Sequence, residues 1–295
     1  MENTPPNIQP LFYEISGPEV LKEEIPLYEV LGSLREYMNI LDRSYLTLTG
    51  KDRLTKKERK SYKIIAYKFS PGSLNIDLSI QTFDILQHVF PFIIPAGAHG
   101  VWELAKSSYD FVKLVYEARS ENRPVEVSTN NSVEQLVQQD GNNIQIHPSV
   151  AINAEHIENS VIIISNQIRE GINRYTLQDE NEQGIKITEN EKRLFSPETI
   201  VDDKPESLLV NIYRLDTESR KGKLHAIERG EIRDIPFQIV GDQAIEPYIE
   251  ALKSEQVKIT ALKELAKNIE GKDYVARLQI INFPDFDSRQ KGLFK

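Results

Sequence analysis

The sequence predicts an α+β protein with an N-terminal α+β unit, a helical middle segment and a C-terminal β-rich α+β unit. Apolar residues recur at alternating spacings of four and three over residues 27–45 and again over 150–168, which places them on one face of a helix. Over residues 74–80, apolar and polar residues alternate, as in a strand with one buried face. Strand-like stretches after residue 207 surround one helix, which favours a small α+β sheet or a partly open barrel.

The N-terminal α+β domain, residues 11–120, begins after a polar segment, residues 1–10, that we expect to be a disordered tail. A strand over Leu11–Ser16 ends at the turn pair Gly17-Pro18. Two strands, Tyr62–Phe69 and Ser73–Ile80, are expected to pair around Pro71-Gly72, and a helical region over about 81–119 completes the domain. The apolar stripe of the first helix consists of Leu27, Leu31, Leu34, Met38, Leu41 and Tyr45.

The middle of the chain begins with a polar linker, residues 121–143, that is expected to hold one short helix near Ser132–Gln139. Residues 144–200 then form a helix and a hairpin. Pro148-Ser149 starts the helix, and Gly171 lies where a C-terminal cap is expected. Its stripe consists of Val150, Ala154, Ile157, Val161, Ile164 and Ile168, and the hairpin strands cover Asn173–Leu177 and Ile185–Thr188.

The C-terminal β-rich domain covers residues 201–284, and residues 285–295 are expected to be a loose tail. A polar stretch over residues 199–206 marks its boundary, and its helix is predicted over residues 244–254. Its strands are predicted over Leu208–Leu215, Lys223–Ile227, Ile232–Val240, Val257–Leu262 and Tyr274–Ile281.

The composition excludes several classes of protein. The chain has 36 Lys and Arg against 45 Asp and Glu, a net charge of −9, which argues against a nucleic-acid ligand. It has no cysteine, so disulfides, thiolate metal sites and cysteine nucleophiles are excluded, and a reducing cytoplasm fits. The N-terminus lacks the basic and apolar regions of a signal peptide.

One segment, Ile85–Leu104, has about the 20 residues of a bilayer span. Polar residues and prolines interrupt it, so we expect a buried, proline-broken helix and no membrane partner. The interrupting residues are Gln87, His88, Pro91, Pro95, His99 and Glu103.

No motif with catalytic or metal-binding spacing is present. The five histidines are scattered, and the sequence contains no glycine-rich phosphate loop, no HExxH and no GxSxG. We therefore expect a protein that is not an enzyme and needs no cofactor or metal. The alternative is an enzyme whose acid–base chemistry uses Glu, Asp, Lys and Tyr alone.

Three groups of residues are candidates for an interface. The basic run from Lys51 to Lys68, which includes Lys56, Lys57 and Arg59, can seat an anion or an acidic partner, or it is a solvated connector. Trp102 is either a core residue or an exposed aromatic anchor. Ile157, Val161 and Ile164 form a stripe that serves either a core or an oligomer interface.

Three stretches carry a resemblance to a known family: YKIIAYKFSPGSLNIDLSI (62–80), VAINAEHIENSVIIISNQIREG (150–171) and VKITALKEL (257–265). In length and layout the chain resembles the phage-encoded Gabija anti-defence proteins. This resemblance implies a non-enzymatic inhibitor in the host bacterial cytoplasm. It would assemble as a homo-oligomer around a bacterial nuclease and helicase-like defence complex and stop that complex binding and cutting DNA.

A competing relationship starts from the hairpin that ends in GSLNIDLSI, which is also similar to uncharacterised bacterial proteins carried on mobile elements. That likeness implies an accessory protein with another protein partner. Neither relationship transfers a site residue.

Overall fold

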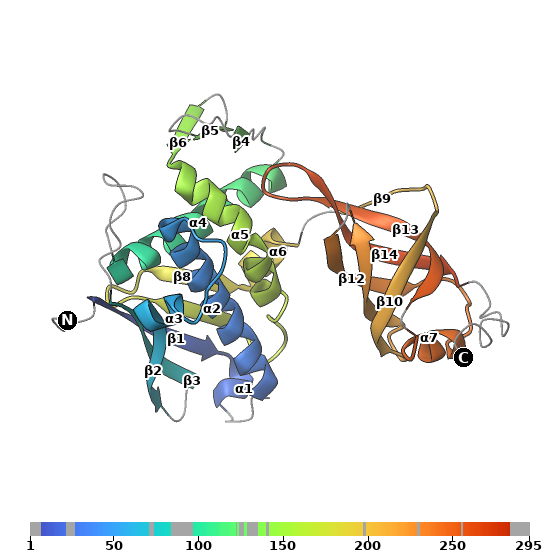
Figure 1. Ribbon diagram of the computed structural model, residues 1–295, viewed down its shortest axis with the longest axis horizontal. Coiled ribbons are helices and arrows are strands. Elements are labelled where there is room, and N and C mark those ends of the chain that lie inside the picture. The colour runs from blue at the N-terminus through green and yellow to red at the C-terminus, as the bar shows by residue number, and fades with distance from the viewer. Residues whose placement is uncertain are drawn as a thin grey trace. The chain divides into compact units, whose positions relative to one another are not determined.

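The structure is a computed structural model. It describes residues 7–21, 27–70, 74–83, 97–121, 123, 127–128, 135–139, 142–196, 199–228, 231–254 and 256–283. The chain forms two compact units. Unit 1 comprises residues 1–196 and 269–271, and unit 2 comprises residues 197–268 and 272–295. The predicted α+β class is confirmed (Figure 1).

A five-stranded antiparallel sheet forms the base of unit 1, with the strand order β2-β3-β1-β7-β8. The hairpin that the sequence predicts around Pro71-Gly72 is confirmed as the pairing of β2 with β3. The strands are β1 (Asn7–Ser16), β2 (Tyr62–Ser70), β3 (Leu74–Thr82), β7 (Arg174–Gln178) and β8 (Gly184–Thr188).

Strand β1 begins earlier than the sequence predicts, so residues 7–10 of the expected tail are strand. The sequence did not predict this extension, because Pro10 lacks the backbone N–H that a central strand needs. Over residues 7–11, however, β1 pairs only with β3, since its pairing with β7 starts at Phe12. Pro10 therefore lies where one side of the strand is unpaired.

Three long helices pack on this sheet, and side chains from all of them fill one hydrophobic core with β1 and β3. Tyr13 of β1 and Ile157 of α5, from segments that the sequence separates by a linker, are both fully buried in that core. The helices of unit 1 are α1 (Pro18–Leu21), α2 (Leu27–Thr49), α3 (Glu58–Ser61), α4 (Gly97–Ser120), α5 (Pro148–Ser165) and α6 (Glu189–Leu194).

The expected linker and the short strand predicted after it, Asn143–Ile146, form a second, three-stranded sheet of β4 (Val127–Ser128), β5 (Gln135–Gln139) and β6 (Asn142–Ile146). The helix expected near Ser132–Gln139 is therefore wrong. The pair Asp140-Gly141 between the two longer strands is the typical sequence of a two-residue hairpin turn, and this signal outweighs the helical composition.

Two further predictions in unit 1 need correction. The helical region expected over residues 81–119 is shorter, because β3 runs to Thr82 and α4 begins at Gly97. Most of the apolar segment that starts at Ile85 lies outside the described residues. Helix α5 ends at Ser165, so Gly171, with φ +95°, lies in the following loop and does not cap the helix. Among the helices that the structure describes, none is long and apolar enough to cross a membrane.

Unit 2 is a five-stranded barrel with the strand order β10-β11-β12-β14-β13, closed by pairing of β13 with β10. Neighbouring strands are antiparallel except β12 and β14, which are parallel, and α7 (Glu246–Ala251) connects β12 to β13. This connectivity is that of an OB-fold, a Greek-key barrel whose topology alone assigns no ligand. The strands are β10 (Glu206–Asp216), β11 (Lys221–Glu228), β12 (Glu231–Ile239), β13 (Val257–Lys267) and β14 (Asp273–Asn282), with β9 (Ile200–Val201) paired to β13.

The core of unit 2 consists of the inward side chains of these strands, which alternate with outward ones as the sequence predicts. Residues 269–271, between β13 and β14 in sequence, belong to unit 1. There Ile269 is buried in the core, and its carbonyl accepts a hydrogen bond from Arg119 Nη2 at 2.9 Å.

Candidate binding surface on the C-terminal barrel

A β-bulge in β10 gives the barrel an exposed tyrosine. Ile212 pairs with Leu224 and Arg214 pairs with Lys223, so Tyr213 is an extra residue without a partner on β11. As a result Tyr213 and Arg214, although adjacent in sequence, are both exposed, and Tyr213 is 41 % exposed.

Tyr213 belongs to a polar and aromatic cluster that crosses three strands. Its ring stacks on His225 of β11, with ring centroids 4.6 Å apart and an interplanar angle of 25°. His225 Nε2 lies 3.3 Å from Asp234 Oδ1 on β12, and these two residues face each other in the strand register. Partial burial and the nearby Asp234 carboxylate raise the pKa of Tyr213 to about 12.

Cationic side chains surround the stacked rings. Arg214, Lys221 and Lys223 are exposed, and the register pairs Arg214 with Lys223 across β10 and β11. Within the part of the chain that the structure describes, Lys221 and Lys223 make no ion pair. We call Arg214, Lys221, Lys223, Tyr213 and His225 the barrel face.

Two acids near the barrel face, Asp216 and Asp234, are engaged by neighbouring groups. Asp216 Oδ1 accepts backbone hydrogen bonds from Ser219 at 3.2 Å and Glu218 at 3.0 Å, and these bonds lower the pKa of Asp216. Asp234 contacts His225 and Tyr213. The barrel face therefore offers flat aromatic rings beside positive charge, which suits binding of an anion that carries planar groups.

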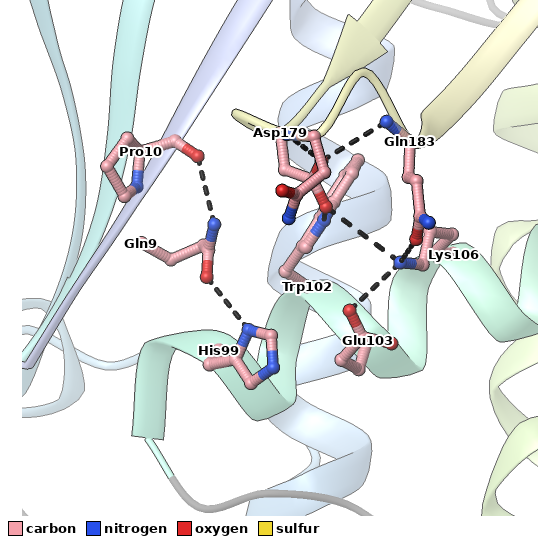
Figure 2. A network of polar contacts seen from close by, with 9 residues as sticks. Gln9, Pro10, His99, Trp102, Glu103, Lys106, Asp179 and Gln183 are labelled. Atoms are coloured by element: carbon pink, nitrogen blue, oxygen red, sulfur yellow. Dashed lines mark hydrogen bonds and ion pairs between the residues drawn. The ribbon is translucent and has the colours of Figure 1, made fainter.

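Trp102 lies in the core of unit 1 and is not an interface anchor. It is fully buried on α4, and its Nε1–H donates to Asp179 Oδ2 at 2.9 Å (Figure 2). Asp179 Oδ1 also accepts from the backbone N–H of Asn181 and Gln183, at 2.9 and 3.1 Å, and Lys106 Nζ lies 3.9 Å from Oδ2. Burial raises the pKa of Asp179, but the hydrogen bonds from Trp102 and the turn outweigh it and hold this pKa below its usual value.

The stripe of Ile157, Val161 and Ile164 is also core, because each of these side chains is fully buried within unit 1. The interface alternative for this stripe is wrong. Charged substitutions there are expected to unfold the protein, since they place an unpaired charge in the core.

The basic segment is exposed, but some of its positive charges are paired with neighbouring carboxylates. Lys56 and Lys57 are exposed. The Arg59 guanidinium makes two hydrogen bonds to the Asp42 carboxylate, at 3.1 and 2.5 Å, and Lys51 pairs with Glu58 at 3.2 Å. This arrangement matches a solvated connector more closely than a focused anion site.

Three further histidines have structural partners. His156 Nδ1 lies 3.4 Å from Thr47 Oγ1. His99 Nδ1 lies 2.9 Å from Gln9 Oε1 (Figure 2), and His147 Nδ1 accepts the Ser149 N–H at the start of α5, at 3.2 Å. Across the described residues, no group of three His, Asp or Glu side chains is placed to hold a metal ion.

Comparison with known proteins finds no match: no protein-family model, no curated protein and no solved structure is similar enough to this chain. The barrel face was missed at the level of sequence, although one signal was present. In the stretch Leu208–Leu215 the apolar–polar alternation breaks at Tyr213-Arg214, and such a break in a strand is typical of a bulge.

Proposed function

We propose that the protein acts by binding and not by catalysis, and that the barrel face is its binding surface for an anionic ligand. The observation that carries this proposal is the exposed Tyr213–His225 stack with three exposed cations beside it. Protein surfaces that hold anions combine Lys and Arg with little competing negative charge; here Asp216 accepts backbone hydrogen bonds from its own turn and Asp234 lies against His225.

The distribution of charge between the units supports an anionic ligand for the barrel. Unit 2 has 16 Lys and Arg against 17 Asp and Glu, whereas unit 1 has 20 against 28. The net charge of −9 therefore belongs almost entirely to unit 1. Because salt screens charges beyond about 10 Å, local charge decides what the barrel face attracts.

Retention on immobilised heparin tests this proposal. We expect the full chain to be retained, and the double variant Lys221→Glu with Lys223→Glu to elute at lower salt. The double variant Lys56→Glu with Lys57→Glu changes the net charge equally on unit 1 and serves as the matched control. Equal elution of the two variants, or no retention of the wild type, would contradict an anion-binding barrel face.

The resemblance to anti-defence proteins remains a second proposal, in which the protein inhibits a bacterial defence nuclease complex by binding it. One observation favours a protein partner: Leu27, Tyr28 and Leu31 at the start of α2 are 69 %, 72 % and 54 % exposed. Adjacent exposed apolar side chains of this size mark protein interaction sites.

Light-scattering mass after size exclusion, on the protein mixed with the purified Gabija complex, tests the second proposal. A co-eluting species heavier than either component is expected, and Leu27→Ser with Leu31→Ser should abolish it. The pair Ile249→Ser and Leu252→Ser, two exposed apolar residues of unit 2, is the control. Separate peaks for the two wild-type components would rule out the inhibitor and favour an accessory protein with another partner.

A further inference from the structure

We infer that the anionic ligand of the barrel face is single-stranded nucleic acid, with a base on the exposed Tyr213–His225 stack and phosphates at the flanking cations. This inference rests on the proposed function, since it names the ligand of the same surface. It is argued from three features: the open rings, the spacing of the cations and the local charge.

The rings are available to a ligand. Tyr213 is 41 % exposed, and 46 % of the His225 side chain is open to solvent, although the two rings already stack on each other. The stack on His225, which itself lies 3.3 Å from Asp234, orders the Tyr213 ring before a ligand arrives. A base that extends this stack meets a surface that is already ordered, which lowers the entropic cost of binding.

The cations lie where a backbone that passes the rings would carry its phosphates. Lys221 and Lys223 are two residues apart on β11 and point to the same side as His225, so neighbouring members of this row are about 7 Å apart along the strand. Arg214 faces Lys223 on the adjacent strand and follows Tyr213 directly. Arg214 and Lys223 thus lie within two positions of the stack, whereas Lys221 lies four positions from His225 along β11 and faces Asp216 on β10.

The chemistry favours a single strand over the other polyanions. In a duplex the bases are paired and stacked inside, so the rings would gain no contact, whereas an unpaired base has a free π-face. An acidic peptide satisfies the cations, but its carboxylates have no planar ring to stack on Tyr213. The net negative charge of the whole chain argues against a nucleic-acid ligand. Almost all of that charge belongs to unit 1, so the argument does not apply to the barrel face.

Fluorescence anisotropy on the full chain tests the inference. The probes are fluorescein-labelled oligo-dT and oligo-U of about 16 nucleotides, which covers the site size of one barrel. A DNA duplex of the same length and unlabelled heparin serve as competitors. We expect both single strands to bind and to outcompete the duplex, and their relative affinity to show whether DNA or RNA is preferred.

Variants separate stacking from charge. Tyr213→Ala should weaken binding about 5- to 100-fold, the usual effect of losing one stacked base, whereas Tyr213→Phe keeps the ring and should bind within about twofold of wild type. Lys223→Gln should reduce the slope of log affinity against log salt by about 0.7, as expected for one lost phosphate contact. Tyr28→Ala, which removes a still more exposed tyrosine on unit 1, is the control for the first variant.

The outcomes distinguish this inference from the proposed function. If heparin and duplex bind as tightly as the single strands and Tyr213→Ala changes nothing, the barrel face binds anions but nucleic acid is not its ligand. If no polyanion binds, both the inference and the proposed function are overturned. If Tyr213→Ala fails to fold, the preference for single strands over the duplex and the salt slope of Lys223→Gln still decide the question.

Discussion

Each unit contains an aromatic residue beside an aspartate: Trp102 donates a hydrogen bond to Asp179 in unit 1, and Tyr213 lies near the Asp234 carboxylate in unit 2. The residue types match, but the surroundings differ. Trp102 is fully buried and Asp179 is 5 % exposed, whereas Tyr213 is 41 % exposed and the Asp234 side chain 52 %. Burial makes the first pair part of the folding free energy, while exposure leaves the second pair free to meet a ligand.

The largest expected effect comes from Trp102→Ala. Removing a fully buried tryptophan leaves a cavity and takes one hydrogen bond from the Asp179 carboxylate, so the free energy of unfolding of unit 1 should fall by about 3–5 kcal/mol. Urea unfolding followed by far-UV circular dichroism measures it, because the chain has one tryptophan and the variant removes the fluorescence probe. A loss below about 1 kcal/mol would show that the contrast between the two pairs is wrong.

A smaller and pH-dependent effect is expected for Asp179→Asn. The pKa of Asp179 is lowered in the folded state, so the ionised carboxylate stabilises unit 1 above the ordinary carboxyl pKa of about 3.9, and this contribution is lost as the pH falls through the lower folded value. At neutral pH the variant should cost about 1–2 kcal/mol, the scale of hydrogen bonds to a charged group.

Below pH 4 the wild type and Asp179→Asn should converge in stability. Unfolding curves measured from pH 7 to pH 3 compare them, and Asp203→Asn, at an exposed position of unit 2, is a control for the loss of one negative charge. A difference that stays constant over this range would mean that ionisation of Asp179 contributes nothing.

The smallest effect on stability is expected for Tyr213→Ala. Substitutions at exposed positions change the free energy of unfolding by less than about 1 kcal/mol. Hydrogen exchange of the β10–β12 amides reports on the barrel separately from unit 1. A loss comparable to that of Trp102→Ala would mean that the Tyr213 ring is needed to hold the barrel together, and the exposed stack would then be structural.

Local patterns predicted much of the fold. Each of the five barrel strands is confirmed to within a few residues at the start, because inward residues such as Ile259 and Leu278 alternate with outward ones. The α5 stripe is confirmed as core, because its apolar residues recur at helical spacing and lie on one buried face. The α2 stripe is only partly core, since Leu27 and Leu31 are exposed: periodicity finds the face of a helix but not where its packing partner ends.

The features that decide the site depend on contacts between distant residues, so the sequence could not show them. Barrel closure pairs Leu208 with Ile259, and the hydrogen bond from Trp102 to Asp179 spans 77 positions. The stack of Tyr213 on His225 requires both the bulge in β10 and the register with β11. The periodicity of one strand does not show how it is aligned with its neighbour. From the sequence, an exposed charged or aromatic residue on a strand therefore cannot be distinguished from any other surface residue.

The place of Ile269 has a consequence for how the protein is made. Unit 1 is otherwise complete at residue 196, yet this core residue follows β13 in the chain. A ribosome synthesises β10 to β13 before it reaches Ile269, so the first unit waits for most of the second before it can finish its core. Domains usually fold in the order of translation. Here the N-terminal unit starts first and is completed late, and a fragment that stops at residue 196 lacks a part of its own interior.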